Sequence, residues 1–228
     1  FKEIDENFCE GFKDYLTNKV KKNNGESLSS SSVSSYFNKF RASLKQAVKD
    51  KIILYNSSVD VKIPKVKEKE REYLTIEEVR QLEKTECRYK VLKRAFLFSC
   101  LTGLRSSDIK KLKWKEVHFD NEGSRIHYYQ KKTNNLEYLD ISEQALLYLG
   151  EKGGNEDKPF EGLKSSSYFN VSLIQWMLKA GITKHITFHC ARHTHATLLL
   201  THGVDIYTVS KLLGHKEIKT TQVYARII

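Results

Sequence analysis

Proline is scarce in this sequence, paired cysteines are missing, and no long apolar run occurs. Only 2 of the 228 residues are proline, which suits a chain built mostly of helices. The cysteines, Cys9, Cys87, Cys100 and Cys190, are widely spaced and form no C-x-x-C pair, which fits reduced thiols in a cytosol. No apolar run approaches the roughly 20 residues that cross a bilayer, and the N-terminus does not resemble a signal peptide. These absences argue against a membrane-spanning or secreted protein and indicate a cytoplasmic one.

Charge is the most informative property of the composition. The chain has 39 Lys and Arg against 28 Asp and Glu, a formal net charge of +11. Such an excess points to a polyanionic partner, nucleic acid before a membrane surface. A hydrophobic content of 39% is enough to build a core. Because the chain begins at Phe1 rather than at methionine, we expect further residues upstream in the natural protein.

The segment 64–72 divides the chain in two. It begins with proline, alternates basic and acidic residues and has almost no apolar content, so we predict an extended linker. Residues 1–63 before it form a helical unit, in which the run Ser29–Ser32 supplies a helix N-cap. Apolar residues recur at helical spacing on either side of that run: Ile4, Phe8, Phe12, Leu16 and Val20, then Val33, Phe37, Phe40 and Leu44.

The polar face of the second of these helices is a candidate DNA-binding surface. Asn38, Arg41 and Lys45 follow one another on it at helical spacing. We predict that they lie along a DNA groove. An ordinary solvated helix face is the alternative.

Residues 73–228 have the pattern of a mainly helical domain with one small antiparallel sheet. Thr75-Ile-Glu-Glu78 is a capping box that starts a helix, and a broadly apolar helix ends at Gly103. Three short strands then follow, at 116–119, 125–130 and 137–141, with turn residues between them. Helical patterns return from Ser142 onward.

The segment 185–195 is rich in groups that can do chemistry. His189 and His193 stand four residues apart, as in the zinc helix of metalloproteases. That motif needs a glutamate after the first histidine, where this chain has Cys190, and Arg192 would repel the metal. We therefore predict no metal site.

A phosphodiester site explains these residues better. His189 and Arg192 share a helix face, and a guanidinium with an imidazole suits the oxygens of a phosphate. Arg105 follows Gly103 and Leu104 at a helix–helix corner, where its side chain is held rigidly, and Asp108 is placed to orient it. For either arginine alone, a plain surface charge is the alternative.

Four segments in order resemble the boxes of the tyrosine recombinases, also called the phage integrase family. They are Thr102–Asp108, His189–Thr194, Leu212–His215 and Thr220–Tyr224. The sequence as a whole resembles those of integrases of conjugative transposons and related mobile elements. The resemblance is specific over residues 73–228, and looser over residues 1–63, which it implies to be the helical, SAM-like core-binding domain. It implies the DNA breaking-rejoining fold for the catalytic domain.

The resemblance assigns a role to each box residue. Tyr224 would attack the scissile phosphate and form a 3′-phosphotyrosyl bond, which conserves the phosphodiester energy without ATP or another cofactor. Arg105 and Arg192 would stabilise the phosphorane. His189 would accept the tyrosine proton or bond a phosphate oxygen, and His215 would bond another oxygen. Asp108 stands where many members have glutamate.

Lysines complete the predicted machinery. In the family, a lysine in a β-turn protonates the 5′-oxygen. Lys132 fits that position because threonine follows it, and Lys131 remains open, either as the acid or as a DNA contact. Lys110 and Lys111, with Lys113 and Lys115, are predicted to touch phosphates, and a plain basic surface is the alternative.

The resemblance also implies partners. These are double-stranded attachment or core sites, a homotetramer on DNA that is monomeric when free, and accessory DNA-bending proteins, in the nucleoid of a prokaryote. The implied function is site-specific recombination that integrates or excises a mobile element. A type IB topoisomerase and a non-catalytic DNA-binding regulator are the alternatives. The sequence ends four residues after Tyr224, so the tail that docks on a neighbouring subunit in many members is absent here or trimmed, as is an N-terminal arm-binding domain.

Remaining aromatic and histidine residues receive structural predictions. His193 is expected in a buried hydrogen-bond network, and His195 and His202 at the surface. Trp114, Trp176 and Tyr207 are expected to pack in the core.

Overall fold

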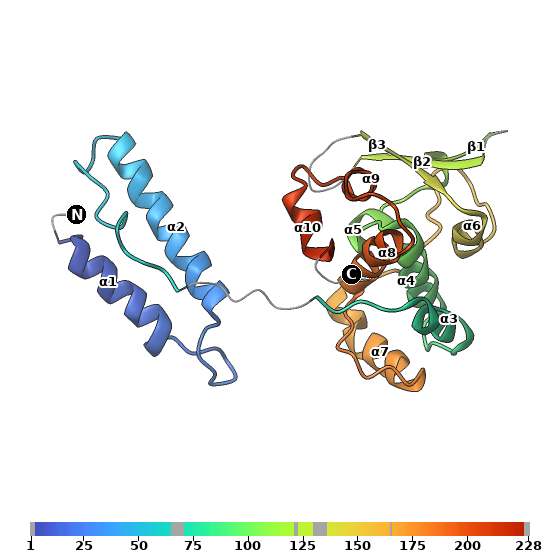
Figure 1. The fold of residues 1–228 in the computed structure, drawn as a ribbon, viewed down its shortest axis with the longest axis horizontal. Coiled ribbons are helices and arrows are strands. Elements are labelled where there is room, and N and C mark those ends of the chain that lie inside the picture. Colours follow the sequence, from blue (N-terminus) through green and yellow to red (C-terminus); the bar gives the residue numbers. More distant parts are fainter. Residues whose placement is uncertain (1–2, 65–70, 121–122, 130–135, 165, 226–228) are drawn as a thin grey trace. The chain divides into compact units, whose positions relative to one another are not determined.

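The computed structural model describes residues 3–64, 71–120, 123–129, 136–164 and 166–225. The chain divides into two compact units, Phe1–Glu70 and Arg71–Ile228 (Figure 1). The second unit therefore begins at Arg71, inside the segment that the sequence predicted to be a linker. None of the helices that the structure describes is both long and apolar enough to cross a membrane.

The first unit consists of two helices and the turns that follow them (Figure 1). Helix α1 (Glu6–Asp14) is capped by the carboxylate of Asp5 and continues as a π-helical turn over Tyr15–Lys19. Helix α2 (Ser30–Lys49) begins at Ser29, whose hydroxyl accepts from the backbone N–H of Ser32, so the predicted serine cap is confirmed. Their apolar faces meet in one core, built on Cys9, Leu16, Val33, Phe37, Leu44 and Val61.

Arg41 helps to hold this unit together. Its guanidinium donates to the carbonyl of Ser58 at 3.0 and 3.1 Å and to the carbonyl of Val61 at 2.8 Å. The side chain thus ties α2 to the segment that returns along it. The sequence placed Arg41 on a DNA-facing stripe, but here its donors are occupied inside the unit.

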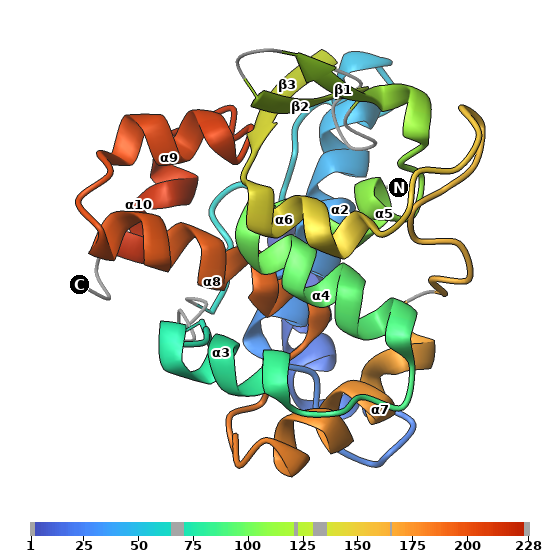
Figure 2. The same ribbon diagram turned by 90° about the vertical axis from the view of Figure 1, so that its right-hand side faces the viewer.

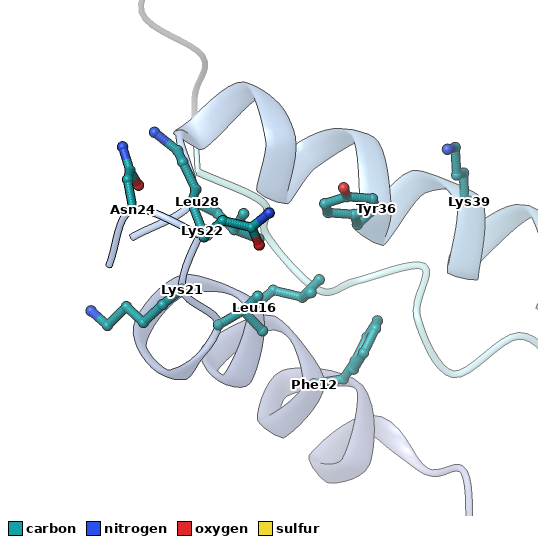
Figure 3. A pocket seen from close by; sticks show the side chains of 10 residues that line it. Phe12, Leu16, Lys21, Lys22, Asn24, Leu28, Tyr36 and Lys39 are labelled. Atoms are coloured by element: carbon teal, nitrogen blue, oxygen red, sulfur yellow. The ribbon is translucent and has the colours of Figure 1, made fainter. Parts of the chain in front are cut away.

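A hollow of about 800 Å³ lies in the first unit, beside the π-helical turn (Figure 3). Phe12, Leu16 and Leu28 form its apolar part, and lysines border it. It contains none of the candidate catalytic residues. The reaction chemistry must be sought in the second unit.

The second unit is a helical body with a sheet at one edge (Figures 1 and 2). Its helices are α3 (Ile76–Lys84), α4 (Lys90–Thr102), α5 (Ser106–Ile109), α6 (Glu143–Leu149), α7 (Ser166–Lys179), α8 (Phe188–Thr201), α9 (Ile206–Leu212) and α10 (Lys219–Ala225). The strands are β1 (Val117–Asp120), β2 (Gly123–Tyr129) and β3 (Leu136–Ile141), after a 3₁₀ turn over Trp114–Glu116. The predicted fold class, mainly helical with a small antiparallel sheet, is confirmed.

The sheet has the order β1-β2-β3 with both pairs antiparallel. Val117 pairs with Ile126, which pairs with Leu139, and all three are buried. The next row, His118, Arg125 and Asp140, faces the other way, as the period of two in a strand requires. The predicted strands agree with the observed ones to within two residues.

Helices α4 and α8 contact each other at the centre of the unit. Phe96 of α4 makes edge-on contacts with Trp176, at 5.8 Å between ring centroids, and with Phe188, at 5.6 Å. Trp114 and Trp176 are buried, as predicted. The prediction for Tyr207 is wrong: its side chain is 69% exposed, because it lies in the first turn of α9 on the solvent side.

Candidate active site

The end of α4 positions the first candidate arginine. Gly103 has a left-handed φ of 68° and closes the helix through its N–H, which donates to the carbonyl of Ser99. The hydroxyl of Ser99 donates in turn to the carbonyl of Leu104 at 2.8 Å. The chain turns sharply here, and Arg105 becomes the N-cap residue of α5.

The predicted capping box of Thr75 and Glu78, which starts α3 in the same unit, is also confirmed.

Helix α8 carries the second arginine and the first candidate imidazole, His189. It starts at Thr187, whose hydroxyl and backbone N–H contact the thiol of Cys190. The helix is buried along most of its length, so most of its polar side chains are fixed by packing. His189, Arg192 and His193 share one face of it.

Arg192 links two helix ends. It is 3% exposed, and its guanidinium donates to the carbonyl of Gly103 at 2.7 Å and to the carbonyl of Leu213. Gly103 ends α4 and Leu213 ends α9, so Arg192 fixes the loops that carry Arg105 and His215. An arginine suits this task because its planar fork reaches two acceptors at once.

The chain after α9 brings in the remaining predicted residues. Gly214, with φ of 58°, lets the chain turn, and the N–H of His215 donates to the carbonyl of Ser210. The imidazole of His215 is hydrogen-bonded through Nδ1 to the hydroxyl of Thr221 at 2.7 Å. Thr221 and Tyr224 are both buried on α10, which packs on α8 and α9.

These side chains line one cavity of about 420 Å³. Arg105, His189, Arg192, His215 and Tyr224, all predicted from the sequence, are brought together there from α4–α5, α8, the α9–α10 turn and α10. The cavity is also lined by Arg71, Gly214, Lys216, Glu217 and Thr220. Lys131 and Lys132 lie outside the described residues.

The cavity is strongly electropositive. Burial first, and then the charge of Arg105, lower the pKa of Arg192 to about 10, so it stays cationic at neutral pH. Arg105 lies 3.9 Å from Asp108 (Nη1 to Oδ2), a separation that allows an ion pair but not a hydrogen bond. Nη1 of Arg105 has no hydrogen-bond partner among the described residues. A phosphate oxygen in the cavity would supply one.

Tyr224 is 1% exposed, and two groups hold its hydroxyl. Nδ1 of His193 lies 2.7 Å from it, and Nη1 of Arg71 lies 3.5 Å from it. Since a guanidinium only donates, the phenolic oxygen accepts from Arg71, and the O–H donates to Nδ1 of His193 in the tautomer that leaves this nitrogen without a proton. Burial raises the pKa of Tyr224, and the charges of Arg71, Arg192 and Arg105 act against that rise.

His193 is part of a buried hydrogen-bond network, as predicted. Its ring packs edge-on against that of His189, at 4.6 Å between centroids. Burial and the neighbouring His189, Arg71, Arg192 and His215 lower the pKa of His193 to about 3. The ring is therefore neutral at physiological pH and orients the tyrosine hydroxyl without ionising.

Arg71 is a residue of this cavity that the sequence did not predict. It lies near the end of the charged stretch 64–72, where the sequence predicts that each charged side chain is exposed to solvent. The sequence feature that could have indicated its place is the apolar Leu74 three residues later. In the structure Leu74 is fully buried, and its N–H donates to Thr194 on α8. Because Leu74 is held against α8, the residues just before it, Arg71 among them, lie near that helix.

The surface prediction for His195 is wrong, since its side chain is 8% exposed. Nδ1–H donates to the carbonyl of Cys100 at 3.2 Å, and the ring lies against Gly103. The sequence could not show this, because His195 follows a polar run on a helix that turns out to be buried on most sides. His202 is exposed, as predicted.

His195 should make the fold sensitive to acid. Burial lowers its pKa to about 4, against about 6.5 in an unfolded chain. The unfolded state therefore binds the extra proton between these values, and stability is lost as pH falls through that window, by up to about 1.4 kcal/mol per pH unit. His195→Gln removes this ionisation. We expect a smaller loss of unfolding free energy between pH 7 and pH 5 than in the wild type, measured by urea denaturation. Equal losses would contradict this assignment.

The predicted DNA contacts are found in different settings. Asn38, Lys45, Lys110 and Lys111 are exposed. Lys113 and Lys115 instead converge on Glu156, at 2.7 and 2.6 Å. The single carboxylate offsets one of these two positive charges, so the pair contributes less to an electropositive surface.

Across the part of the chain that the structure describes, no group of three or more His, Cys, Asp or Glu side chains is gathered in a way that suits a metal ion.

Comparison with family models matches both units. Residues 72–227 match the model of the phage integrase family, and residues 1–63 match that of the phage integrase SAM-like domain. Tyrosine recombinase XerA of Saccharolobus solfataricus is 34% identical over 176 residues, covering 76% of this chain and 58% of that protein. Tyrosine recombinase XerD of Oceanobacillus iheyensis is 31% identical over 216 residues, covering 87% and 72%. Relative to XerA, the chain thus spans less than two thirds of the full length.

Solved structures share the fold. The XerH site-specific recombinase bound to its difH substrate matches with a TM-score of 0.73 at 20% identity, over 99% of this chain and 68% of that one. The Tn1549 transposon integrase, in complex with transposon right end DNA, matches with a TM-score of 0.75 at 18% identity, over 98% and 81%.

Proposed function

The chain belongs to the phage integrase family, and from that premise we propose that it is a site-specific tyrosine recombinase that cleaves and rejoins duplex DNA. The observation that carries the proposal is the gathering of Arg105, Arg192, His189, His215 and Tyr224 around one cavity. Two guanidiniums and two imidazoles beside a phenol suit a phosphodiester in a substitution at phosphorus. A regulator that only bound DNA would have no need of this set.

The proposed reaction proceeds by direct transfer. The oxygen of Tyr224 attacks the phosphorus, the bond from phosphorus to the 5′-oxygen breaks, and a 3′-phosphotyrosyl link forms. The phenolic proton passes to an imidazole: to His189, as the family resemblance implies, or to the neutral His193, whose Nδ1 lies 2.7 Å from the hydroxyl. In the second case His189 bonds a phosphate oxygen. Lys132, or Lys131, gives a proton to the departing 5′-oxygen. Arg105 and Arg192 balance the charge that builds up on the non-bridging oxygens, and His215 hydrogen-bonds one of them.

The first unit and the exposed lysines would hold the duplex. Residues 1–63 would act as the core-binding domain, with Asn38 and Lys45 on the polar face of α2. Lys110 and Lys111 would contact phosphates from the catalytic side. Binding should then weaken with salt, with a slope of about −0.9 per phosphate contact. A tetramer on paired sites, with accessory DNA-bending proteins, completes the proposal for a mobile element in a prokaryotic nucleoid.

Replacement of Tyr224 tests the proposal. On a nicked suicide substrate carrying the attachment site of the host element, the wild type should form a denaturant-resistant protein–DNA adduct. Tyr224→Phe should form none, a loss of at least about a thousandfold, while DNA binding stays within a few fold. Denaturing gels and a binding titration measure the two quantities.

Tyr207→Phe is the matched control, because Tyr207 is exposed on the neighbouring helix α9. It should retain the adduct. An adduct that persisted in Tyr224→Phe would overturn the assignment. Relaxation of any supercoiled plasmid, without preference for a site, would turn the proposal toward a type IB topoisomerase.

A further inference from the structure

Arg71 reaches the reacting atom from outside the four sequence boxes. Its Nη1 lies 3.5 Å from the hydroxyl oxygen of Tyr224, and its guanidinium carbon lies 5.7 Å from the centre of that ring. The side chain also lines the cavity that holds Arg105 and Arg192. It thus contacts both the nucleophile and the space where a phosphate would bind.

Tyr224 needs such a partner because its surroundings disfavour a charged phenolate. The ring is almost fully buried among Ala196, Val209 and Leu213. Burial penalises the charged form of the phenol, so opposite charge nearby has to offset that penalty.

The groups that face the phenol differ in what they can supply. From α8, His193 is hydrogen-bonded to the hydroxyl, but its ring stays neutral and brings no positive charge. Arg192, also on α8, is committed to two backbone carbonyls. Arg105 comes from the start of α5 and lies against Asp108, and His215 comes from the α9–α10 turn, where it is bonded to Thr221. Among the described side chains, Arg71 is a cation whose guanidinium donates directly to the phenolic oxygen.

We infer that Arg71 is a further catalytic residue, which holds the hydroxyl of Tyr224 and stabilises the negative charge that forms on this oxygen as its proton leaves. The inference rests on the proposed strand transfer and adds a residue to it. In this proposal, His193 and Arg71 have different roles. His193 fixes the direction of the O–H bond, and Arg71 favours the ionised oxygen.

The charge of Arg71 can be separated from its bulk. Arg71→Gln keeps a hydrogen-bond donor but removes the charge, and Arg71→Lys keeps the charge. Arg80→Gln on α3 is the matched control, because it removes one positive charge from an exposed position outside the cavity. Single-turnover formation of the adduct on the suicide substrate is followed from about pH 6 to pH 9 for all of them.

We expect Arg71→Gln to cleave about ten- to a hundredfold more slowly than the wild type near neutral pH, by analogy with the loss of one preorganised donor. The deficit should narrow as pH rises, because the phenol then ionises without help. Arg71→Lys should recover most of the rate. Arg80→Gln should match the wild-type rate, and its DNA affinity should equal that of Arg71→Gln within a few fold.

Two results would overturn the inference. One is a rate for Arg71→Gln equal to that of the wild type. The other is a deficit of the same size at every pH, which is what a purely structural role would give.

A readout without DNA keeps the inference distinct from the proposed function. Carbon-13 labelling of the tyrosine rings reports the titration of Tyr224 in the free protein, with Tyr224→Phe identifying its signal. Arg71→Gln should move that titration to higher pH, and Arg80→Gln should leave it in place. If Tyr224 titrated at the same pH in Arg71→Gln as in the wild type, the proposed role of Arg71 would be contradicted, even if the enzyme were active. Failure of the proposed function would instead show as a wild type that forms no adduct.

Discussion

Arg192→Lys is expected to slow strand cleavage by about a thousandfold and to lower the free energy of unfolding by about 2–4 kcal/mol. Both effects follow from one side chain. The guanidinium of Arg192 donates to the carbonyls of Gly103 and Leu213, at the ends of α4 and α9. A lysine has one nitrogen and cannot reach two acceptors in separate segments while also facing the cavity.

The loss of activity should exceed what the loss of stability explains. When the carbonyls of Gly103 and Leu213 lose their donor, the loops that carry Arg105 and His215 lose their common anchor. The site is then both short of one phosphate contact and less well ordered. Adduct formation under conditions where the variant is fully folded, as shown by circular dichroism, measures the catalytic part alone. Cleavage by Arg192→Lys within tenfold of the wild type would show that the double anchor is dispensable.

Gly103→Ala is expected to destabilise the protein by about 2–5 kcal/mol, through two separate costs. The left-handed φ of 68° disfavours any side chain, by about 1–2 kcal/mol. A Cβ atom there would also lie 2.7 Å from Cδ2 of His195 and 2.9 Å from Cδ2 of Leu213. Such crowding in a packed core typically adds about 1–3 kcal/mol.

Gly203→Ala is the matched control for that variant. Gly203 has a φ of +82°, and a Cβ added there would meet nothing within 4 Å. It should therefore show the backbone cost alone, about 1–2 kcal/mol, with cleavage unchanged. Gly103→Ala should also cleave about tenfold more slowly, because the carbonyl of Gly103 holds Arg192. Urea denaturation of both variants measures the difference, and equal losses would contradict the crowding.

Most of the catalytic cavity was predictable, because the residues that form it lie in short motifs with local geometry. The sequence placed Arg105 after a glycine corner, His189 with Arg192 on one helix face, and His215 after a second glycine. The structure brings all of them to one cavity with Tyr224. The capping box at Thr75 was equally legible, since it depends on neighbouring residues alone.

Features that depend on distant contacts were not predictable. In the sequence, Arg71 belongs to a segment predicted to be a charged linker. Its contact with Tyr224 depends on the packing of the following residues on α8. Arg41 reads as a surface cation, yet its acceptors are backbone carbonyls 17 and 20 residues away. His195 is buried because its ring lies against the end of α4, at Cys100 and Gly103. In each case the partner is remote in the sequence, and no local pattern records it.

The central claim is that the oxygen of Tyr224 becomes bonded to the 3′-phosphate of the cleaved strand. The most direct test is to trap the adduct on a suicide substrate, digest the protein and the DNA, and identify the modified peptide by mass spectrometry. The account predicts that the nucleotide is carried by the peptide containing Tyr224 and by no other tyrosine peptide. A nucleotide on any other residue, or cleavage that leaves no covalent protein–DNA bond, would contradict it.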